Sequence, residues 1–211
     1  MKTRIFNLII IDESGSMHGI KREAIDSVNE TIQTIRSAEQ KYVEQEHFVT
    51  LVTFNDYVKT VYACVPIAEV TELTSETYTP MCCTALYDAV GVALNDLRKK
   101  VAEEDKVLVT VVTDGYENAS REYDGKAIKA LVDELKGKGW VFAYIGANHD
   151  VEKVAAKISI KNTMNFRATS EGTIIMTNKL NKAKSRLFER ISCLKGEVFR
   201  ADEANEDFFD E

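Results

Sequence analysis

The chain has 211 residues, of which 45% are hydrophobic, and a formal net charge of −7. It contains no repeat and no linker rich in proline, glycine or serine, so we expect one domain with one sizeable core. Its first apolar run, residues 5–11, contains Asn7 and is too short for a membrane span or a secretory signal. These features argue against a membrane role, and we expect a cytosolic protein.

Short apolar runs alternate with helical patterns along the first part of the chain. The continuous run at residues 5–11 is typical of a central parallel strand that is buried on both faces. A second strand is predicted at residues 47–54, and Asn55-Asp56 then predict a hairpin into an antiparallel edge strand at 57–65. Between the first two strands, one helical face is apolar and consists of Ala24, Ile25, Val28, Ile32 and Ile35.

The same alternation continues to the end of the chain. In order, the sequence predicts a helix with apolar positions from Leu86 to Val101, a strand at 107–113, a helix around Leu131 that ends by Gly139, a strand at 141–147, a short helix at 151–158, a brief strand at 164–166 and a last helix from Leu180 to Leu194. Such alternation predicts an α/β fold: a doubly wound, mostly parallel open sheet with one antiparallel edge strand and helices on both faces.

Oxygen-bearing side chains follow the first predicted strand directly. Asp12, Ser14 and Ser16 alternate in a tight turn around Gly15, so their side chains can converge at the carboxyl end of the strand, where open α/β sheets bind ligands. Oxygen ligands suit hard cations such as Mg²⁺ and Ca²⁺. The turn lacks the Gly-x-Ser-x-Gly pattern of a nucleophile elbow and the glycines of a phosphate loop. The simpler alternative is that Asp12 or Ser16 caps the following helix.

Two distant segments bring further oxygens to the same predicted edge. Thr84 precedes the helix that begins near Leu86, and Asp114 closes the strand at residues 107–113 before Gly115 turns the chain. Taken singly, Thr84 could be an ordinary helix cap and Asp114-Gly115 an ordinary turn. Together with the turn after the first strand, they favour a metal site.

This set of motifs resembles the metal-ion-dependent adhesion site of von Willebrand factor type A domains, in the form of the stand-alone domains of bacteria. The resemblance covers residues 1–166. It implies a Rossmann-like fold and a site for Mg²⁺, with Mn²⁺ or Ca²⁺ as alternative ions, whose remaining coordination position takes a carboxylate from a protein partner. The implied ligands, each matching the family motif in type, are Asp12, Ser14, Ser16, Thr84 and Asp114. Two departures are Glu13, which adds negative charge beside the site, and the adjacent Cys82-Cys83 before Thr84.

We therefore predict a non-enzymatic protein-interaction module that captures an Asp or Glu of its partner through the metal. One alternative is a Mg²⁺-dependent phosphohydrolase with Asp12 as nucleophile, although such enzymes need a second Asp where Ser14 stands. Another is a structural domain whose site is unused. The sequence identifies neither the partner nor the oligomeric state.

Charge is uneven near the end of the chain. Residues 197–211 contain seven acids and one arginine, a net charge of −6, and are predicted to be an acidic tail beyond a domain at 1–196. The last predicted helix is basic, with Lys179, Lys182, Lys184, Arg186, Arg190 and Lys195. Because this helix has no recognised motif and no interleaved aromatic residues, we expect its basic face to be solvated and not to bind nucleic acid. We also expect the acidic tail to pack against this helix and mask it.

Four cysteines occur in the chain, and an ordinary-sized domain without an export signal favours free thiols. They are Cys64, Cys82, Cys83 and Cys193. We expect Cys82-Cys83 to be small residues packed beneath the Thr84 loop.

Overall fold

A six-stranded sheet forms the centre of the computed structural model, which describes residues 2–147, 150–194 and 199–210. Its order is β3-β2-β1-β4-β5-β6, and all neighbours are parallel except β2 and β3, as predicted. The strands are β1 (Thr3–Asp12), β2 (Gln45–Phe54), β3 (Val58–Pro66), β4 (Lys106–Thr113), β5 (Trp140–Ala147) and β6 (Thr163–Phe166). The antiparallel strand β3 lies at one edge, and the short β6 lies at the other.

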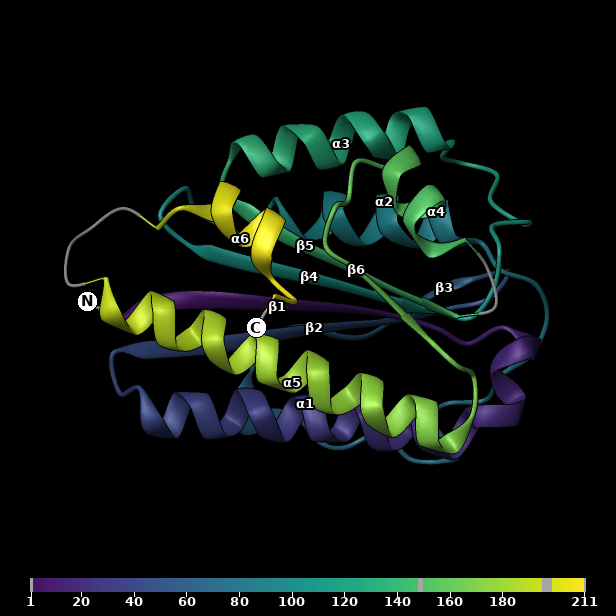
Figure 1. Cartoon of the computed structure of the whole chain (residues 1–211), viewed down its shortest axis with the longest axis horizontal. Helices are drawn as coiled ribbons and strands as arrows, with labels where there is room; N and C mark the ends of the chain where they lie inside the picture. Colours follow the sequence, from purple (N-terminus) through teal and green to yellow (C-terminus); the bar gives the residue numbers. More distant parts are fainter. Residues whose placement is uncertain (1, 148–149, 195–198, 211) are drawn as a thin grey trace.

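Helices cover both faces of this sheet (Figure 1). The helices α1 and α5 pack side by side on one face, and α2, α3 and α4 lie on the other. Their bounds are α1 (Lys21–Lys41), α2 (Leu86–Leu97), α3 (Gly125–Gly137), α4 (Val151–Lys157), α5 (Ser170–Cys193) and α6 (Ala201–Asp207), with 3₁₀ turns η1 (Gly15–Ile20) and η2 (Ile67–Glu69). The doubly wound α/β architecture is confirmed. The apolar pattern that reached Val101 continues four residues beyond the end of α2, and Val101 packs against the core from the following turn.

Two apolar layers, one on each face of the sheet, explain why the first apolar run is continuous. Successive side chains of a strand point to opposite faces. Phe6 and Leu8 therefore pack in the layer beneath α2 and α3, whereas Ile5 and Ile9 pack in the layer beneath α1 and α5. A strand buried on both faces needs no polar alternation.

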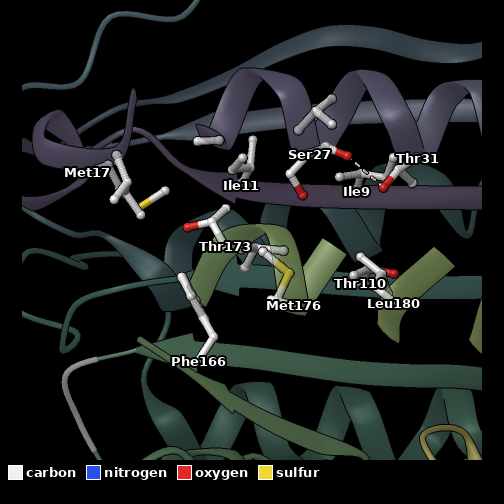
Figure 2. A pocket seen from close by; sticks show the side chains of 14 residues that line it. Ile9, Ile11, Met17, Ser27, Thr31, Thr110, Phe166, Thr173, Met176 and Leu180 are labelled. Atoms are coloured by element: carbon white, nitrogen blue, oxygen red, sulfur yellow. Dashed lines mark hydrogen bonds between the residues drawn. The ribbon is translucent and has the colours of Figure 1, made fainter. Parts of the chain in front are cut away.

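A small cavity of about 20 Å³ remains between β1, β4, α1 and α5. Figure 2 shows Ile9 and Ile11 on the sheet side and Met176 and Leu180 on the α5 side, with the Thr110 hydroxyl at one end. A space of this size holds about one water molecule, so it is a packing gap and not a site for an organic ligand.

The prediction that all basic residues of the last helix are solvated is wrong for Lys184. Its side chain is fully buried on the sheet-facing side of α5, where Nζ donates a hydrogen bond to Thr110 Oγ1 at 3.0 Å. Lys184 follows Leu180 by four residues and precedes Leu187 by three, which is the spacing of one helix face. It therefore shares the apolar face, while Lys179 and Lys182 are exposed.

The described part of the acidic C-terminal segment packs into the same core as the rest of the chain. It forms α6, and Ala201 and Ala204 of this helix, together with Phe208 directly after it, join the apolar layer beneath α1 and α5. Arg190 of α5 forms an ion pair with Asp207 of α6 at 2.9 Å. The acidic segment therefore contacts the basic helix that it was predicted to cover. Four residues of the predicted basic helix and tail, Lys195, Glu197, Val198 and Glu211, lie outside the described residues.

Other sequence expectations concern cysteines and membrane spans. All four cysteines are free thiols. Cys82 and Cys83 are exposed, however, and do not pack beneath the Thr84 loop as expected. Among the helices of the described residues, none has the length and apolar character needed to cross a membrane.

Candidate metal centre

Asp12 ends β1 at the carboxyl edge of the sheet and is fully buried. Its Oδ1 accepts a hydrogen bond from the Ser14 backbone N–H at 2.7 Å, which closes the turn into η1. Its Oδ2 accepts from the Thr113 hydroxyl at 2.5 Å. The carboxylate is therefore fixed both by its own turn and by the neighbouring strand β4.

Ser14, Ser16 and Asp114 form a chain of contacts beside Asp12. The Ser14 and Ser16 hydroxyl oxygens lie 3.1 Å apart, and Ser16 Oγ donates to Asp114 Oδ1 at 2.5 Å. The sheet explains this meeting of distant residues, because β1 and β4 are parallel neighbours with Ile11 opposite Val112. Both strands therefore end at the same edge, where Asp12 is the last residue of β1 and Asp114 directly follows β4.

Thr84 completes the set, and Gly115 shows how closely the oxygens converge. A β-carbon at position 115 would lie 3.3 Å from Thr84 Oγ1, 3.7 Å from Ser16 Oγ and 3.9 Å from Asp12 Oδ2. These three oxygens thus lie within 4 Å of one point, which the β-carbon of a larger residue would occupy. Glycine leaves this space open.

The Thr84 loop is held in place by two residues that follow β4. The Thr84 N–H donates to Asn118 Oδ1 at 2.9 Å, and the Asn118 N–H donates back to the Thr84 carbonyl at 3.0 Å. Glu117 Oε2 accepts from the Tyr87 N–H in the first turn of α2 at 3.0 Å. The segment after Asp114 therefore positions Thr84, so that two of the predicted ligands depend on one loop.

A second group of contacts ties the β1 turn to residues 78–82. The buried Tyr78 hydroxyl donates to the Asp12 carbonyl at 2.5 Å, and the Gly15 N–H donates to the Cys82 carbonyl at 3.1 Å. Glu13 is also buried, and its Oε1 accepts from the Thr79 N–H at 2.5 Å. The Glu13 carboxylate therefore anchors this loop to the turn.

Burial dominates the electrostatics of the site. It raises the pKa of Asp12 to about 6, with a smaller contribution from the Asp114 charge, while hydrogen bonds from Ser14 and Thr113 oppose the rise. Burial, followed by the charges of Asp12 and Glu13, also raises the pKa of Tyr78 well above its ordinary value. Tyr78 therefore stays a neutral donor. A cation at the site would stabilise the charged forms of the Asp12 and Asp114 carboxylates.

The donor set fits a hard cation. It consists of two carboxylates and three hydroxyls, and Mg²⁺ and Ca²⁺ prefer oxygen ligands. Within the described ranges, no three His, Cys, Asp or Glu side chains group in a way that could hold a metal ion. The candidate site contains two such side chains, Asp12 and Asp114, and its other three donors are the hydroxyls of Ser14, Ser16 and Thr84.

Sequence reasoning did not identify several residues that shape the site. Thr113 precedes Asp114 in the motif and could have been recognised as the donor to Asp12 from their parallel strands. Tyr78 and Asn118 act through contacts between loops, for which local sequence gives no signal. Glu13 was noted from the sequence as a negative charge beside the site, but its hydrogen bond to the Thr79 loop was not predicted.

The family model of the von Willebrand factor type A domain matches residues 8–183. The chain belongs to this family. The match covers the β1 turn, Thr84 and Asp114, and it ends within α5. No curated protein matches the sequence of this chain.

Solved structures with similar folds include three proteins of low sequence identity. The pilus adhesin SpaC from Lactobacillus rhamnosus GG has a TM-score of 0.62 at 12% identity, covering 89% of this chain and 31% of SpaC. The PilB minor pilin from Streptococcus sanguinis has a TM-score of 0.60 at 14% identity, covering 91% and 64%. Proximal thread matrix protein 1 from the mussel byssus has a TM-score of 0.56 at 15% identity, covering 87% and 46%. The chain thus spans less than half of the byssus protein, and the likeness shows the fold alone.

Proposed function

We propose that this type A domain is a protein-interaction module that binds Mg²⁺ and uses it to capture an Asp or Glu side chain of a protein partner. The observation that carries the proposal is the convergence of Thr84, Ser16 and Asp12 oxygens around the open point beside Gly115. Asp12, Ser14, Ser16, Thr84 and Asp114 would hold the ion. When bound, the ion supplies a positive centre that accepts a carboxylate oxygen.

Structural neighbours support an interaction role. A pilus adhesin, a minor pilin and a byssus matrix protein carry the same fold. Because fold alone does not fix function, the proposal rests on the site, and the neighbours only favour binding over catalysis.

The phosphohydrolase alternative is disfavoured by the contacts of Asp12. Both of its carboxylate oxygens already accept hydrogen bonds, one from Ser14 and one from Thr113. The adjacent Glu13, which could serve as a base, is engaged by Thr79. General acid–base chemistry needs a group within hydrogen-bond reach of the reacting proton. Metal-dependent hydrolysis of a generic phosphate ester that disappears in Asp12→Asn would favour the enzyme instead.

Thermal denaturation with and without Mg²⁺ tests the metal site. A ligand at 100 times its dissociation constant adds about 2.7 kcal/mol to the free energy of unfolding, so the midpoint should rise by several degrees. Gly115→Ala should reduce or abolish this rise, because its methyl group would lie next to the ligand oxygens of Thr84, Ser16 and Asp12, although none of the ligand residues is replaced.

Gly19→Ala is the matched control, since a β-carbon there meets nothing within 4 Å. It should keep the full Mg²⁺ effect. A midpoint that does not respond to saturating Mg²⁺ in the unmodified protein would reject the proposal. If Mg²⁺ binds, a pull-down with Ser14→Ala beside the unmodified chain then identifies the partners that need the metal.

A further inference from the structure

Three exposed apolar residues lie on loops at the sheet edge that carries the candidate metal centre. The described residues include six large hydrophobic side chains that are mainly exposed. Three of them, Tyr57 (80% exposed), Met81 (54%) and Tyr116 (56%), lie on three separate loops at the carboxyl edge of the sheet. We refer to Tyr57, Met81 and Tyr116 as the apolar rim.

Each rim residue belongs to a loop that contacts the site. The Met81 N–H donates to the Glu13 carbonyl at 2.9 Å, next to the β1 turn. Tyr57 follows Asp56, whose Oδ1 accepts from the Cys83 N–H at 2.7 Å, one residue before Thr84. The three loops therefore meet at the segment that carries the ligand oxygens.

Tyr116 lies two residues after Asp114, and its position is also fixed. Its hydroxyl accepts a hydrogen bond from the Asp150 N–H at 3.4 Å at the start of α4. The ring is thus tethered at its polar end while more than half of the side chain stays exposed. Tyrosine is enriched among interface hot spots, and methionine is enriched at interfaces.

Charges around the rim restrict the kind of partner. Asp56 and Glu117 are the sequence neighbours of Tyr57 and Tyr116, Asp150 at the start of α4 contacts the Tyr116 hydroxyl through its N–H, and the whole chain has a net charge of −7. A strongly acidic segment would be repelled by these groups. A single carboxylate between apolar side chains would meet the cation without adding further negative charge near Asp56 and Glu117.

We propose that the apolar rim selects a partner segment in which one Asp or Glu is flanked on both sides by large apolar residues. The inference rests on the proposed function, because the acid is the group that the metal captures. The rim adds the neighbouring side chains to what is recognised. Rim residues are therefore specificity determinants and not metal ligands.

Two fluorescent capped heptapeptides with a central aspartate test this inference in saturating Mg²⁺. In one peptide leucine and phenylalanine flank the aspartate, and in the other serine flanks it on both sides. We expect the apolar-flanked peptide to bind at least tenfold more tightly by fluorescence polarisation. Tyr57→Ser, Met81→Ser and Tyr116→Ser should each weaken its binding at least threefold while leaving the Mg²⁺-induced rise in melting temperature unchanged.

Val43→Ser is the matched control for these variants. Val43 is 74% exposed and precedes β2, so it lies at the opposite edge of the sheet. Its replacement should leave peptide binding unchanged. Alkylation provides a second readout, because the exposed Cys82 and Cys83 adjoin Met81 and should react more slowly with bound peptide, whereas Cys193 at the end of α5 should not.

The outcomes separate the two proposals. Equal affinity for both peptides, rim variants that behave like Val43→Ser, or no binding of either peptide would overturn the inference about the rim. Binding that persists after the central aspartate is changed to asparagine, or after Mg²⁺ is chelated, would instead reject the metal-dependent capture of an acid.

Discussion

At the scale of single residues, Lys184 is the most unusual feature of the core. Its only described hydrogen-bond partner is the Thr110 hydroxyl, and burial lowers the pKa of its ammonium to about 7. Burial also lowers the pKa of the nearby His47 to about 4, and the charge of Lys184 adds to this effect. Near neutral pH, the histidine is therefore uncharged, and Lys184 is the group that titrates.

Lys184→Met should stabilise the protein near pH 6.5. In the unfolded chain the lysine has a pKa near 10.5, so the native state binds fewer protons between pH 7 and 10.5, and the stability of the unmodified protein rises with pH across that window. Below pH 7 the native state contains a buried charge. Replacing buried charged groups with apolar ones is often neutral or stabilising by about 1–4 kcal/mol.

Urea unfolding at pH 6.5 and pH 9.5 measures this effect. The gain in free energy of unfolding from Lys184→Met should be larger at pH 6.5 and should shrink at pH 9.5. Lys179→Met, at an exposed position of the same helix, is the control and should show no such pH dependence. A gain that is equal at both pH values would contradict a lowered pKa for Lys184.

The helical spacing of Lys184 with Leu180 and Leu187 indicates that Lys184 is buried. The candidate site could be predicted from the order of the strands instead. Asp12 and Asp114 follow apolar strands, and parallel strands place their ends at one edge, so sequence was enough to bring them together. Tyr78 and Asn118 come from loops with no periodic pattern. Their hydrogen bonds to Asp12 and Thr84 depend on loop paths that only the tertiary structure defines.

At the scale of elements, α6 and the segment before β6 cover the part of β5 that has no strand partner on that side. The strand β6 pairs only with residues 144–147 of β5, which leaves the first half of β5 without a strand partner on that side. Asn205 of α6 fills this gap, accepting from the Phe142 N–H at 2.9 Å and donating to the Trp140 carbonyl at 2.7 Å. Asn162 donates to the Phe142 carbonyl at 3.0 Å. Side-chain amides thus replace a strand.

Asn205→Leu should destabilise the protein. The Phe142 N–H and the Trp140 carbonyl would lose their buried partner, and each unsatisfied buried group costs about 1–3 kcal/mol. Denaturant unfolding should show a lower midpoint. Asp202→Ala, an exposed change in the same helix, should leave the free energy of unfolding within about 0.5 kcal/mol of that of the unmodified protein. Equal stability of both variants would show that α6 does not protect the edge of β5.

The sequence predicted the main elements better than it predicted α6. Long apolar patterns such as residues 5–11 and the α1 face identify their elements because each buries many side chains. Three apolar positions in and directly after α6 also have helical spacing, but they are few among many acids: Ala201, Ala204 and Phe208. Composition therefore predicted a tail, whereas Asn205 and these three residues secure a helix against β5.

At the scale of the whole molecule, the candidate metal centre and α6 lie at opposite ends of the sheet and share its strands. Asp12 and Asp114 lie at the carboxyl ends of β1 and β4, and Trp140 opens β5 at the other end, beside Asn205. Ile9 and Val141 belong to the same apolar layer as Ala204 of α6. A continuous layer of this kind favours a single cooperative transition.

Trp140, the single tryptophan, reports on this cooperation. If the sheet unfolds as one unit, Mg²⁺ at the carboxyl edge should raise the midpoint seen by Trp140 fluorescence and the midpoint seen by far-ultraviolet circular dichroism by the same amount. Gly115→Ala should reduce both shifts together. If Mg²⁺ raises the circular dichroism midpoint but not the Trp140 fluorescence midpoint, the β5–α6 end unfolds separately. In that case, metal bound at the carboxyl edge stabilises only the strands that hold it.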